Sequence, residues 1–313
     1  MTNLSEFTFL SSDGKTQLHG MLWEPEGVAV RAVLQICHGV AEHIARYDGF
    51  ARALNEQGIV VAGHDHLGHG KSLPEGGTPV YFGDGNTWNT VVDDIYVLHQ
   101  RLKQRYPDVP LCIMGHSMGS FLTRTYLIRY PGTVKAAVIM GTGWQPQAAI
   151  TGGLALANAI AAVSGENATS ELVTELAFGS YNKLFAPNRT KVDWLSADES
   201  NVDDYIADPL CGADATVGLF RQMLHGIRFN QRQSHLRQMD REMPVLFVAG
   251  DKDPVGSCGK GVRQTYDAFR AAGMRDCTLK LYPGLRHEIL NEKAYTADIT
   301  KNIEAWLLSR LEK

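Results

Sequence analysis

The fold is decided by the stretch Leu-Cys-Ile-Met-Gly-His-Ser-Met-Gly, residues 111–119. Its first part, Leu111–Met114, predicts a buried strand, and Met118–Tyr130 predicts a helix that ends before a proline. A serine between two glycines at such a turn is typical of a nucleophile elbow, where the flanking residues must be very small. The amino end of the helix also places positive charge beneath the hydroxyl. We therefore interpret Ser117 as a nucleophile; the alternative is an ordinary glycine-rich turn.

Strands and helices alternate on both sides of this motif. Short, wholly apolar strands separated by helices indicate a mostly parallel sheet with helices on both faces. An Asp13-Gly14 pair between the first two strands predicts a hairpin. The predicted strands are Phe7–Leu10, Gln17–Trp23, Ala32–Cys37, Ile59–Ala62, Leu111–Met114, Val134–Met140, Val245–Ala249 and Cys277–Tyr282. The predicted helices are Tyr47–Gln57, Thr90–Tyr106, Met118–Tyr130, Val262–Ala272 and Ala294–Leu311.

The alternation is interrupted between residues 144 and 238, where the sequence is helical, polar and rich in loops. We therefore expect one α/β core built from residues 1–143 and 239–313, with residues 144–238 inserted as a helical cap. The stretch Ala148–Val163 predicts a helix of small and aliphatic residues. Polar and glycine residues interrupt it, so we expect it to be too short and too mixed to span a bilayer.

Composition excludes several classes of protein. The 313 residues are 44% hydrophobic and 20% charged, which excludes a disordered chain, a coiled coil and a collagen-like repeat. The net charge of −4 and the absence of a basic cluster argue against a nucleic-acid partner. Five cysteines without a CxxC spacing favour a reducing, cytoplasmic setting, with Cys37 and Cys112 buried in strands. Residues 1–15 lack the pattern of a signal peptide.

A serine alcohol needs a general base, and the base needs a carboxylate to orient it. At a nucleophile elbow of this kind the chain order is serine, acid, histidine. His287 follows the last predicted strand and is the candidate base. Asp251 and Asp253 both follow the strand at 245–249, and the pattern alone does not choose between them. The carboxylate that is not used is expected to cap a turn or a helix.

Acyl transfer also requires two backbone N–H donors for the oxyanion. One comes from the residue after the serine, here Met118. The other comes from the loop after the strand Ala32–Cys37, which begins with His38 and Gly39. Because glycine allows a close approach of the backbone, we assign the second donor to Val40.

Five motifs together resemble the monoglyceride lipases and related bacterial lysophospholipase-like hydrolases. The resemblance covers residues 7–143 and 245–313, and the insertion takes the position of the family's cap. Parts of the region 181–218 also resemble bacterial members. The five motifs are His38-Gly39 with Glu42-His43 and Arg46-Tyr47, the stretch His64–Ser72, Gly115–Gly119, Gly250 with Asp253, and Arg286-His287-Glu288.

The resemblance implies an α/β-hydrolase fold, a Ser-His-Asp triad, no cofactor and hydrolysis of fatty acyl esters. It selects Asp253 as the triad acid. Glu42 and Arg46 are similar to residues that shape the polar end of the family's pocket; their alternative role is an ion pair one helical turn apart that braces a helix start. Leu290 stands where animal monoglyceride lipases carry a second histidine, which weakens the inference of glycerol specificity.

The sequence thus predicts a serine hydrolase of monoacylglycerols or similar single-chain acyl esters. Lysophospholipase, short-chain carboxylesterase and peptidase or amidase activity are alternatives with the same triad. The histidines of residues 64–69 suggest a metallohydrolase, but we expect no bound metal there because the flanking glycines suit a tight loop. A non-catalytic binding protein on the same fold is the last alternative. The expected partners are the small ester and a transient lipid interface at the cap; the oligomeric state is not predicted.

Overall fold

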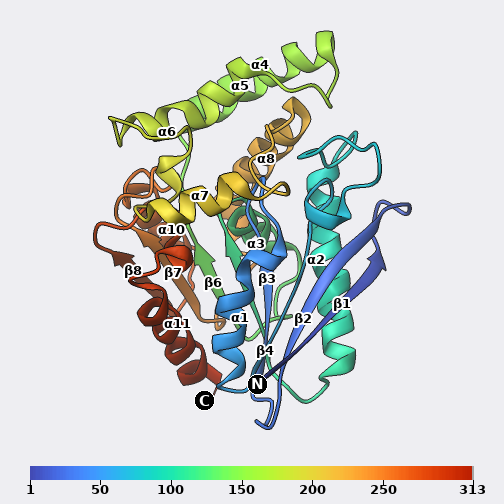
Figure 1. The fold of residues 1–313 in the computed structure, drawn as a ribbon, viewed down its shortest axis with the longest axis vertical. Helices are drawn as coiled ribbons and strands as arrows, with labels where there is room; N and C mark the ends of the chain where they lie inside the picture. The colour runs from blue at the N-terminus through green and yellow to red at the C-terminus, as the bar shows by residue number, and fades with distance from the viewer. Residues whose placement is uncertain (312–313) are drawn as a thin grey trace.

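The computed structural model describes residues 1–311, which fold around one eight-stranded sheet with helices on both faces (Figure 1). The strands lie in the order β1-β2-β4-β3-β5-β6-β7-β8. All eight were predicted, and the predicted bounds of β3 and β8 are confirmed. The strands are β1 Thr2–Leu10, β2 Gln17–Pro25, β3 Ala32–Cys37, β4 Ile59–His64, β5 Leu111–His116, β6 Ala136–Met140, β7 Val245–Gly250 and β8 Cys277–Tyr282.

The sheet is parallel except at its amino-terminal edge. β1 pairs antiparallel with β2, and β2 pairs antiparallel with β4, whereas the remaining described neighbours pair in parallel. The β1–β2 connection turns at Gly14, whose φ is 77°, as the Asp-Gly pair predicts. Strands β3 to β7 are buried along their whole length, which explains why they are continuous apolar runs in the sequence.

Helices cover both faces of the sheet and enclose two large apolar clusters. On one face lie α1 (Asp48–Asn55) and α11 (Thr296–Leu311). On the other lie α2 (Thr87–Arg105), α3 (Met118–Arg129) and α10 (Lys260–Ala271). This three-layer arrangement is the α/β fold that the sequence predicts.

Several predicted starts were wrong by two to five residues, and a contact in the structure accounts for two of them. α2 begins at Thr87, three residues before the predicted start, because Trp88 is already buried in the first turn and its indole N–H donates to the hydroxyl of Thr125 at 3.0 Å. β6 begins two residues later than predicted. Val134 is buried but lies outside the ladder with β5, which starts at Ala136. In both cases a tertiary contact, rather than local periodicity, fixes the boundary.

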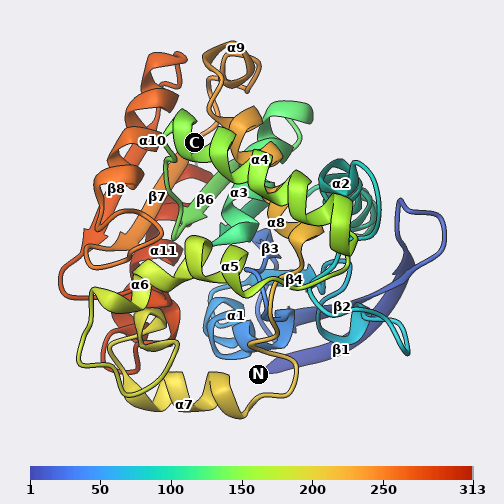
Figure 2. The same cartoon turned by 90° about the horizontal axis from the view of Figure 1, so that it is seen from above.

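The segment between β6 and β7 is helical, as predicted, and we call residues 144–238 the inserted segment. It lies over the carboxyl edge of the sheet (Figures 1 and 2). Its one described β contact is an isolated bridge between Thr169 and Thr216. Its α-helices are α4 Gln147–Ser164, α5 Glu171–Thr174, α6 Ser180–Lys183, α7 Glu199–Ala207, α8 Val217–Asn230 and α9 Gln233–Leu236, with a π-helical turn at Glu175–Gly179. Short 3-10 turns occur at Ile44–Tyr47, Gly70–Ser72, Asp193–Leu195 and Ile289–Asn291.

The outermost element of the inserted segment is α4, which packs on α8 and turns its other side outward (Figure 2). Its 18 residues have a mean hydropathy of 1.3, and 17% of them are buried. By length and composition it is the one helix within residues 1–311 that could cross a membrane. The expectation that this stretch is too short and too mixed to span a bilayer was therefore wrong by length and composition, because the helix runs from Gln147 to Ser164 and keeps that mean hydropathy despite its threonine, glycine and asparagine positions.

Candidate active site

Ser117 lies between β5 and α3 in a strained backbone conformation, with φ 54° and ψ −122°. Such a positive φ is rare for a residue with a side chain and is found at sites where function requires it. The neighbours explain why glycines flank it. A methyl group on Gly119 would lie 2.0 Å from the carbonyl oxygen of Cys37, and one on Gly115 would lie 2.2 Å from the carbonyl of Gly119. The turn can form only when both positions lack a side chain.

The loop after β3 lies directly against the serine. A methyl group on Gly39 would be 3.0 Å from the Cβ of Ser117. The N–H of Gly39 donates to the Glu42 carboxylate at 2.5 Å, which fixes the loop. Neither the Val40 N–H nor the Met118 N–H donates a hydrogen bond to another described residue. Both are therefore available for an oxyanion beside the serine.

Asp253 and His287 lie side by side after β7 and β8. The Nδ1–H of His287 donates to the Asp253 carboxylate at 2.9 Å, and the same oxygen accepts the Val255 N–H at 2.9 Å. Both side chains are almost fully buried, with exposures of 0% for Asp253 and 2% for His287. Asp251 lies elsewhere, where it accepts the Gly284 N–H at 2.8 Å and caps a turn at the surface. Of the two aspartates, Asp253 is the one that the structure brings to the histidine.

The end of β6 connects Ser117 with His287. The Ser117 N–H donates to the carbonyl of Met140 at 3.1 Å. A methyl group on the next residue, Gly141, would lie 3.1 Å from Cε1 of His287. Within the described residues, no hydrogen bond joins the Ser117 hydroxyl to His287. Such bonds are often long in a substrate-free enzyme and tighten when substrate binds.

Glu42 and Arg46 belong to a buried charged network. Besides Gly39, Glu42 accepts hydrogen bonds from Tyr47 at 3.1 Å and from Arg46 at 3.0 Å. Arg46 also makes two parallel hydrogen bonds to Glu288, at 2.6 and 2.8 Å. Burial opposes the ionisation of Glu42 and Glu288, but the opposing positive charges outweigh it and hold the pKa of both carboxyls below the ordinary range. The network joins the loop after β3 to the residue after His287.

His116 connects this network to His287. Its Nδ1 lies 3.1 Å from the Glu42 carboxylate and its Nε2 lies 3.3 Å from the carbonyl of His287. Each nitrogen of this imidazole faces an acceptor, an arrangement that favours the protonated ring. Burial disfavours that charge, yet the hydrogen bond and charge of Glu42 raise the pKa of His116. The ring lies 4.7 Å from that of His287, so Glu42 positions two parts of the site at once.

The inserted segment holds the histidine loop in place. The Glu288 N–H donates to the carbonyl of Leu195 at 2.7 Å, and Arg286 donates to the carbonyl of Ser196 at 3.0 Å. The ring of Trp194 lies 5.1 Å from the ring of His287. On α7, the amide of Asn201 donates to the Glu288 carboxylate at 2.8 Å. The inserted segment and the rest of the chain therefore meet at His287.

Four residues at the site were missed as functional candidates: His116, Trp194, Asn201 and Glu288. His116 and Glu288 stood inside two of the quoted motifs, so their position next to Ser117 and His287 was the available signal. For Trp194 and Asn201 there was no such signal of a position next to a site residue, because their contacts are made between segments about 90 residues apart in the sequence. Such contacts follow from the fold and not from local pattern.

The histidines of residues 64–69 are packed into the interior against the loop after β3. The ring of His66 lies 4.2 Å from the ring of His38 and 5.0 Å from that of His64. Asp65, beside them, accepts the N–H groups of Ile44 and Lys71 at 2.8 and 2.9 Å. Within residues 1–311, one place brings three candidate metal-ligand atoms together, and it does not include these histidines. That place is His43, Asp208 and Cys211, where His43 is already hydrogen bonded to Asp208 at 2.8 Å.

The buried histidines make stability depend on pH. Burial lowers the pKa of His64 and of His69 to about 3 in the folded protein, against about 6.5 when unfolded. Between these values the unfolded chain binds more protons, so stability falls as the pH falls below 6.5. Each histidine is expected to cost about 2 kcal/mol at pH 5 relative to pH 7. Urea unfolding of the wild type and of His69→Gln at both pH values measures this effect. Between pH 7 and pH 5 the free energy of unfolding of the variant should fall by about 2 kcal/mol less than that of the wild type. An equal fall in both proteins contradicts the assignment.

Taken with its strained serine at the carboxyl edge of the sheet, the fold defines the class: this protein is an α/β hydrolase. More narrowly, the chain belongs to the Hydrolase_4 family, described as "Serine aminopeptidase, S33", whose profile matches residues 28–294. The class and family predicted from the five sequence motifs are confirmed.

Relatives and solved structures agree with this membership. The chain is 31% identical over 312 residues to a monoacylglycerol lipase of Mycolicibacterium smegmatis, with 98% of each chain covered. It is 28% identical to the monoglyceride lipase of Mus musculus, covering 96% of this chain and 90% of that one. A thermostable carboxyl esterase from Bacillus coagulans has 26% identity and a TM-score of 0.92, with 99% and 100% of the chains covered. The protein is accordingly a serine carboxylic ester hydrolase.

Proposed function

We propose that this enzyme hydrolyses monoacylglycerols or similar single-chain acyl esters through a triad of Ser117, His287 and Asp253. The observation that carries the proposal is the buried hydrogen bond of 2.9 Å between His287 and Asp253, on the same sheet edge as a serine with φ 54°. The mycobacterial and mouse relatives, named as lipases of monoacylglycerols, support the substrate class. The small-molecule ester is the substrate, and the proposed chemistry uses no metal and no cofactor.

The chemistry follows from the positions of these groups. Because Nδ1–H of His287 is given to Asp253, Nε2 is the basic nitrogen that takes the Ser117 proton as Oγ attacks the ester carbonyl. Asp253 stabilises the imidazolium that forms. The same proton then goes to the leaving alcohol, and a water molecule, activated by His287, releases the fatty acid from Ser117.

The oxyanion of the tetrahedral intermediate is held by the N–H groups of Val40 and Met118. Both belong to backbone that is fixed before substrate arrives: Glu42 holds the loop through Gly39, and Met118 begins α3. Donors fixed in this way stabilise the developing charge without rearrangement, which is worth about 10²–10³-fold in rate for one donor.

Glu42 and Arg46 line a cavity of about 250 Å³ together with Glu288 and Leu290. We propose that they shape the polar end of the site. Their hydrogen bonds to the oxyanion loop and to Glu288 favour an indirect role, in which they brace the groups that contact the alcohol. The described lining of this cavity also includes Asp204 and Lys293 and includes neither Ser117 nor His287, so the proposed head group rests on the relatives and not on this cavity.

The inserted segment, residues 144–238, is proposed to act as a cap that roofs the acyl site and makes transient contact with a lipid interface. Five of its described large apolar side chains are exposed, and the most exposed are Val163 at 88% and Leu184 at 61%. Apolar area of this kind favours binding at the boundary of a lipid layer. The core is proposed to comprise residues 1–143 and 239–313, and the cytoplasm is the proposed location.

Substitutions in α4 test the proposal that the inserted segment covers the acyl site. Leu154 is buried and Leu156, about 200° further around the helix, is half-buried, so replacing both by serine removes apolar surface from two sides of the helix. The double variant is expected to lose activity on long acyl chains more than on short ones. Rates on esters of increasing chain length measure this, with Val163→Ser, on the exposed side, as the control. Equal losses at every chain length would contradict an acyl site under α4.

The substrate assignment is tested by fatty-acid release from a medium-chain monoacylglycerol, the matching lysophospholipid and the matching amide, with Ser117→Ala as the blank. Preference for the monoacylglycerol supports the proposal. Preference for the lysophospholipid or a short-chain ester would move the assignment to lysophospholipase or carboxylesterase. Preference for the amide would agree with the peptidase description of the family instead.

A further inference from the structure

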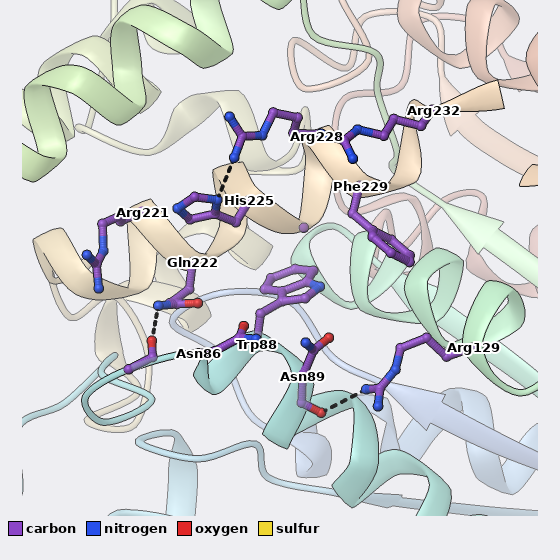
Figure 3. A pocket seen from close by; sticks show the side chains of 12 residues that line it. Asn86, Trp88, Asn89, Arg129, Arg221, Gln222, His225, Arg228, Phe229 and Arg232 are labelled. Carbon is purple, nitrogen blue, oxygen red and sulfur yellow. Dashed lines mark hydrogen bonds between the residues drawn. The ribbon is translucent and has the colours of Figure 1, made fainter. Parts of the chain in front are cut away.

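A second cavity, of about 560 Å³, lies away from the catalytic residues, between α8 and the first turn of α2 (Figure 3). Its volume is in the range of small-molecule sites. Neither the serine nor the residues proposed to act with it are among its described lining. The lining residues are Gly85, Asn86, Trp88, Asn89, Arg129, Arg221, Gln222, His225, Gly226, Arg228, Phe229 and Arg232.

The lining is strongly positive although the whole chain is acidic, with a net charge of −4. Four of the lining residues are arginines, and no described lining residue is an aspartate or glutamate. Two of the arginines are neutralised from outside: Arg129 pairs with Asp93 at 2.8 Å, and Arg221 pairs with Glu166. Within residues 1–311, Arg228 and Arg232 form no ion pair. Two positive charges are therefore left facing one cavity.

Uncharged donors surround these arginines. An Arg228 N–H donates to Nδ1 of His225 at 3.1 Å, which leaves the His225 proton on Nε2 as a donor. The side-chain amides of Asn86 and Asn89 make no hydrogen bond to another described residue. Both belong to the amino end of α2, where the helix dipole adds positive potential. N–H groups that have no hydrogen-bond acceptor within the protein are typical of a site that binds an anion.

Aromatic rings form the rest of the wall. Figure 3 shows Trp88 and Phe229 between the arginines of α8 and Arg129 of α3. The cavity thus offers a cationic rim and an apolar surface together. A free inorganic ion would use only the rim, whereas a ligand with a small organic body would use both parts.

We propose that this cavity is a binding site for an organic phosphate, with the phosphate on Arg228 and Arg232 and its organic part on Trp88 and Phe229. Guanidinium groups match the geometry of phosphate oxygens, and two of them without acidic partners supply the charge that such a group requires. The proposal does not depend on the proposed function, because it concerns binding at a cavity that the hydrolysis does not use.

The phosphate could come from two sources that share this chemistry. One is a soluble phosphate monoester. The other is the phosphodiester head group of an anionic lipid, since α8 packs directly under the exposed apolar helix α4. The experiment therefore has two arms: calorimetric titration of the full chain with glycerol 3-phosphate, and co-sedimentation with phosphatidylglycerol vesicles. Glycerol and phosphatidylcholine vesicles are the uncharged controls.

We expect saturable binding to at least one of the two phosphate probes, weakened at high salt because the contacts are partly exposed. The R228Q/R232Q variant should bind at least tenfold more weakly, and R228K/R232K should lose less, since it keeps the charge but not the paired donors. R263Q, which removes one charge from α10 as R232Q removes one beside the cavity, should bind like the wild type. R232Q alone, at an exposed position, should weaken binding about threefold.

Binding to glycerol 3-phosphate identifies a soluble ligand, and binding to phosphatidylglycerol vesicles alone identifies a lipid head group; either result supports the site when it depends on the two arginines. The proposal is overturned if the wild type binds neither probe. It is also overturned if the glutamine variants bind as tightly as the wild type, or if the neutral controls bind as well as the charged probes.

Discussion

Replacing Ser117 by alanine is expected to lower kcat for ester hydrolysis by at least about 10³-fold while the protein stays folded. The change removes one hydroxyl and keeps the Cβ, so the φ of 54° is as accessible to alanine as to serine. The hydroxyl makes no hydrogen bond to His287 in the described structure, so little stability is lost with it. Initial rates on a monoacylglycerol, together with a thermal melt, measure both parts.

Ser120→Ala is the matched control for that experiment. Ser120 is also buried, three residues further along α3, and its hydroxyl donates to the carbonyl of Ser117 at 2.6 Å. Its loss is expected to cost about 1 kcal/mol of stability and to leave most of the catalytic rate. Near-wild-type activity of Ser117→Ala would refute the nucleophile, and equal inactivation by both changes would point to a structural effect of the turn.

Asp253→Asn is expected to reduce kcat by about 10⁴-fold, the effect of the same change in a serine protease triad. The buried carboxylate receives Nδ1–H of His287 at 2.9 Å. An asparagine amide favours the wrong tautomer and cannot stabilise the imidazolium, so the base fails although the geometry stays nearly the same. Rates of ester hydrolysis for this variant and for Asp251→Asn measure the difference.

Asp251→Asn should stay within a few-fold of the wild-type rate. Its carboxylate accepts the Gly284 N–H at an exposed turn, and an asparagine oxygen can accept the same hydrogen bond. The two variants make the same chemical change two residues apart, so differences in charge or expression cancel. A large loss with Asp251→Asn and a small one with Asp253→Asn would show that the other carboxylate serves the histidine.

The sequence predicted the sheet well because its inner strands are buried on both faces and therefore appear as continuous apolar runs. The candidate site residues could be proposed for a related reason: Ser117 and Asp253 follow such strands, and His287 follows the partly exposed strand β8, at the same edge of the sheet. Asp253 could not be separated from Asp251 by pattern alone. The structure places only Asp253 against His287, and the difference depends on the turn that Asp251 caps.

The features that the sequence did not predict all involve long-range contacts. Arg46 donates a hydrogen bond to Glu288, which lies 242 residues further along the sequence, and no local periodicity predicts that pair. The cavity of arginines draws on α2, α3 and α8, which are separate helices in the sequence. The extent of α4 was predicted to within one residue at each end, and its packing on α8 supports a helix that contains glycine and threonine.

The most direct measurement of the central claim is to map the adduct of a fluorophosphonate, which reacts with an activated serine, by mass spectrometry of the digested protein. The account predicts one adduct, on the peptide carrying Ser117, formed in step with the loss of ester hydrolysis and absent from Ser117→Ala. An adduct on another residue, or ester hydrolysis that survives full exposure to the reagent, would contradict it.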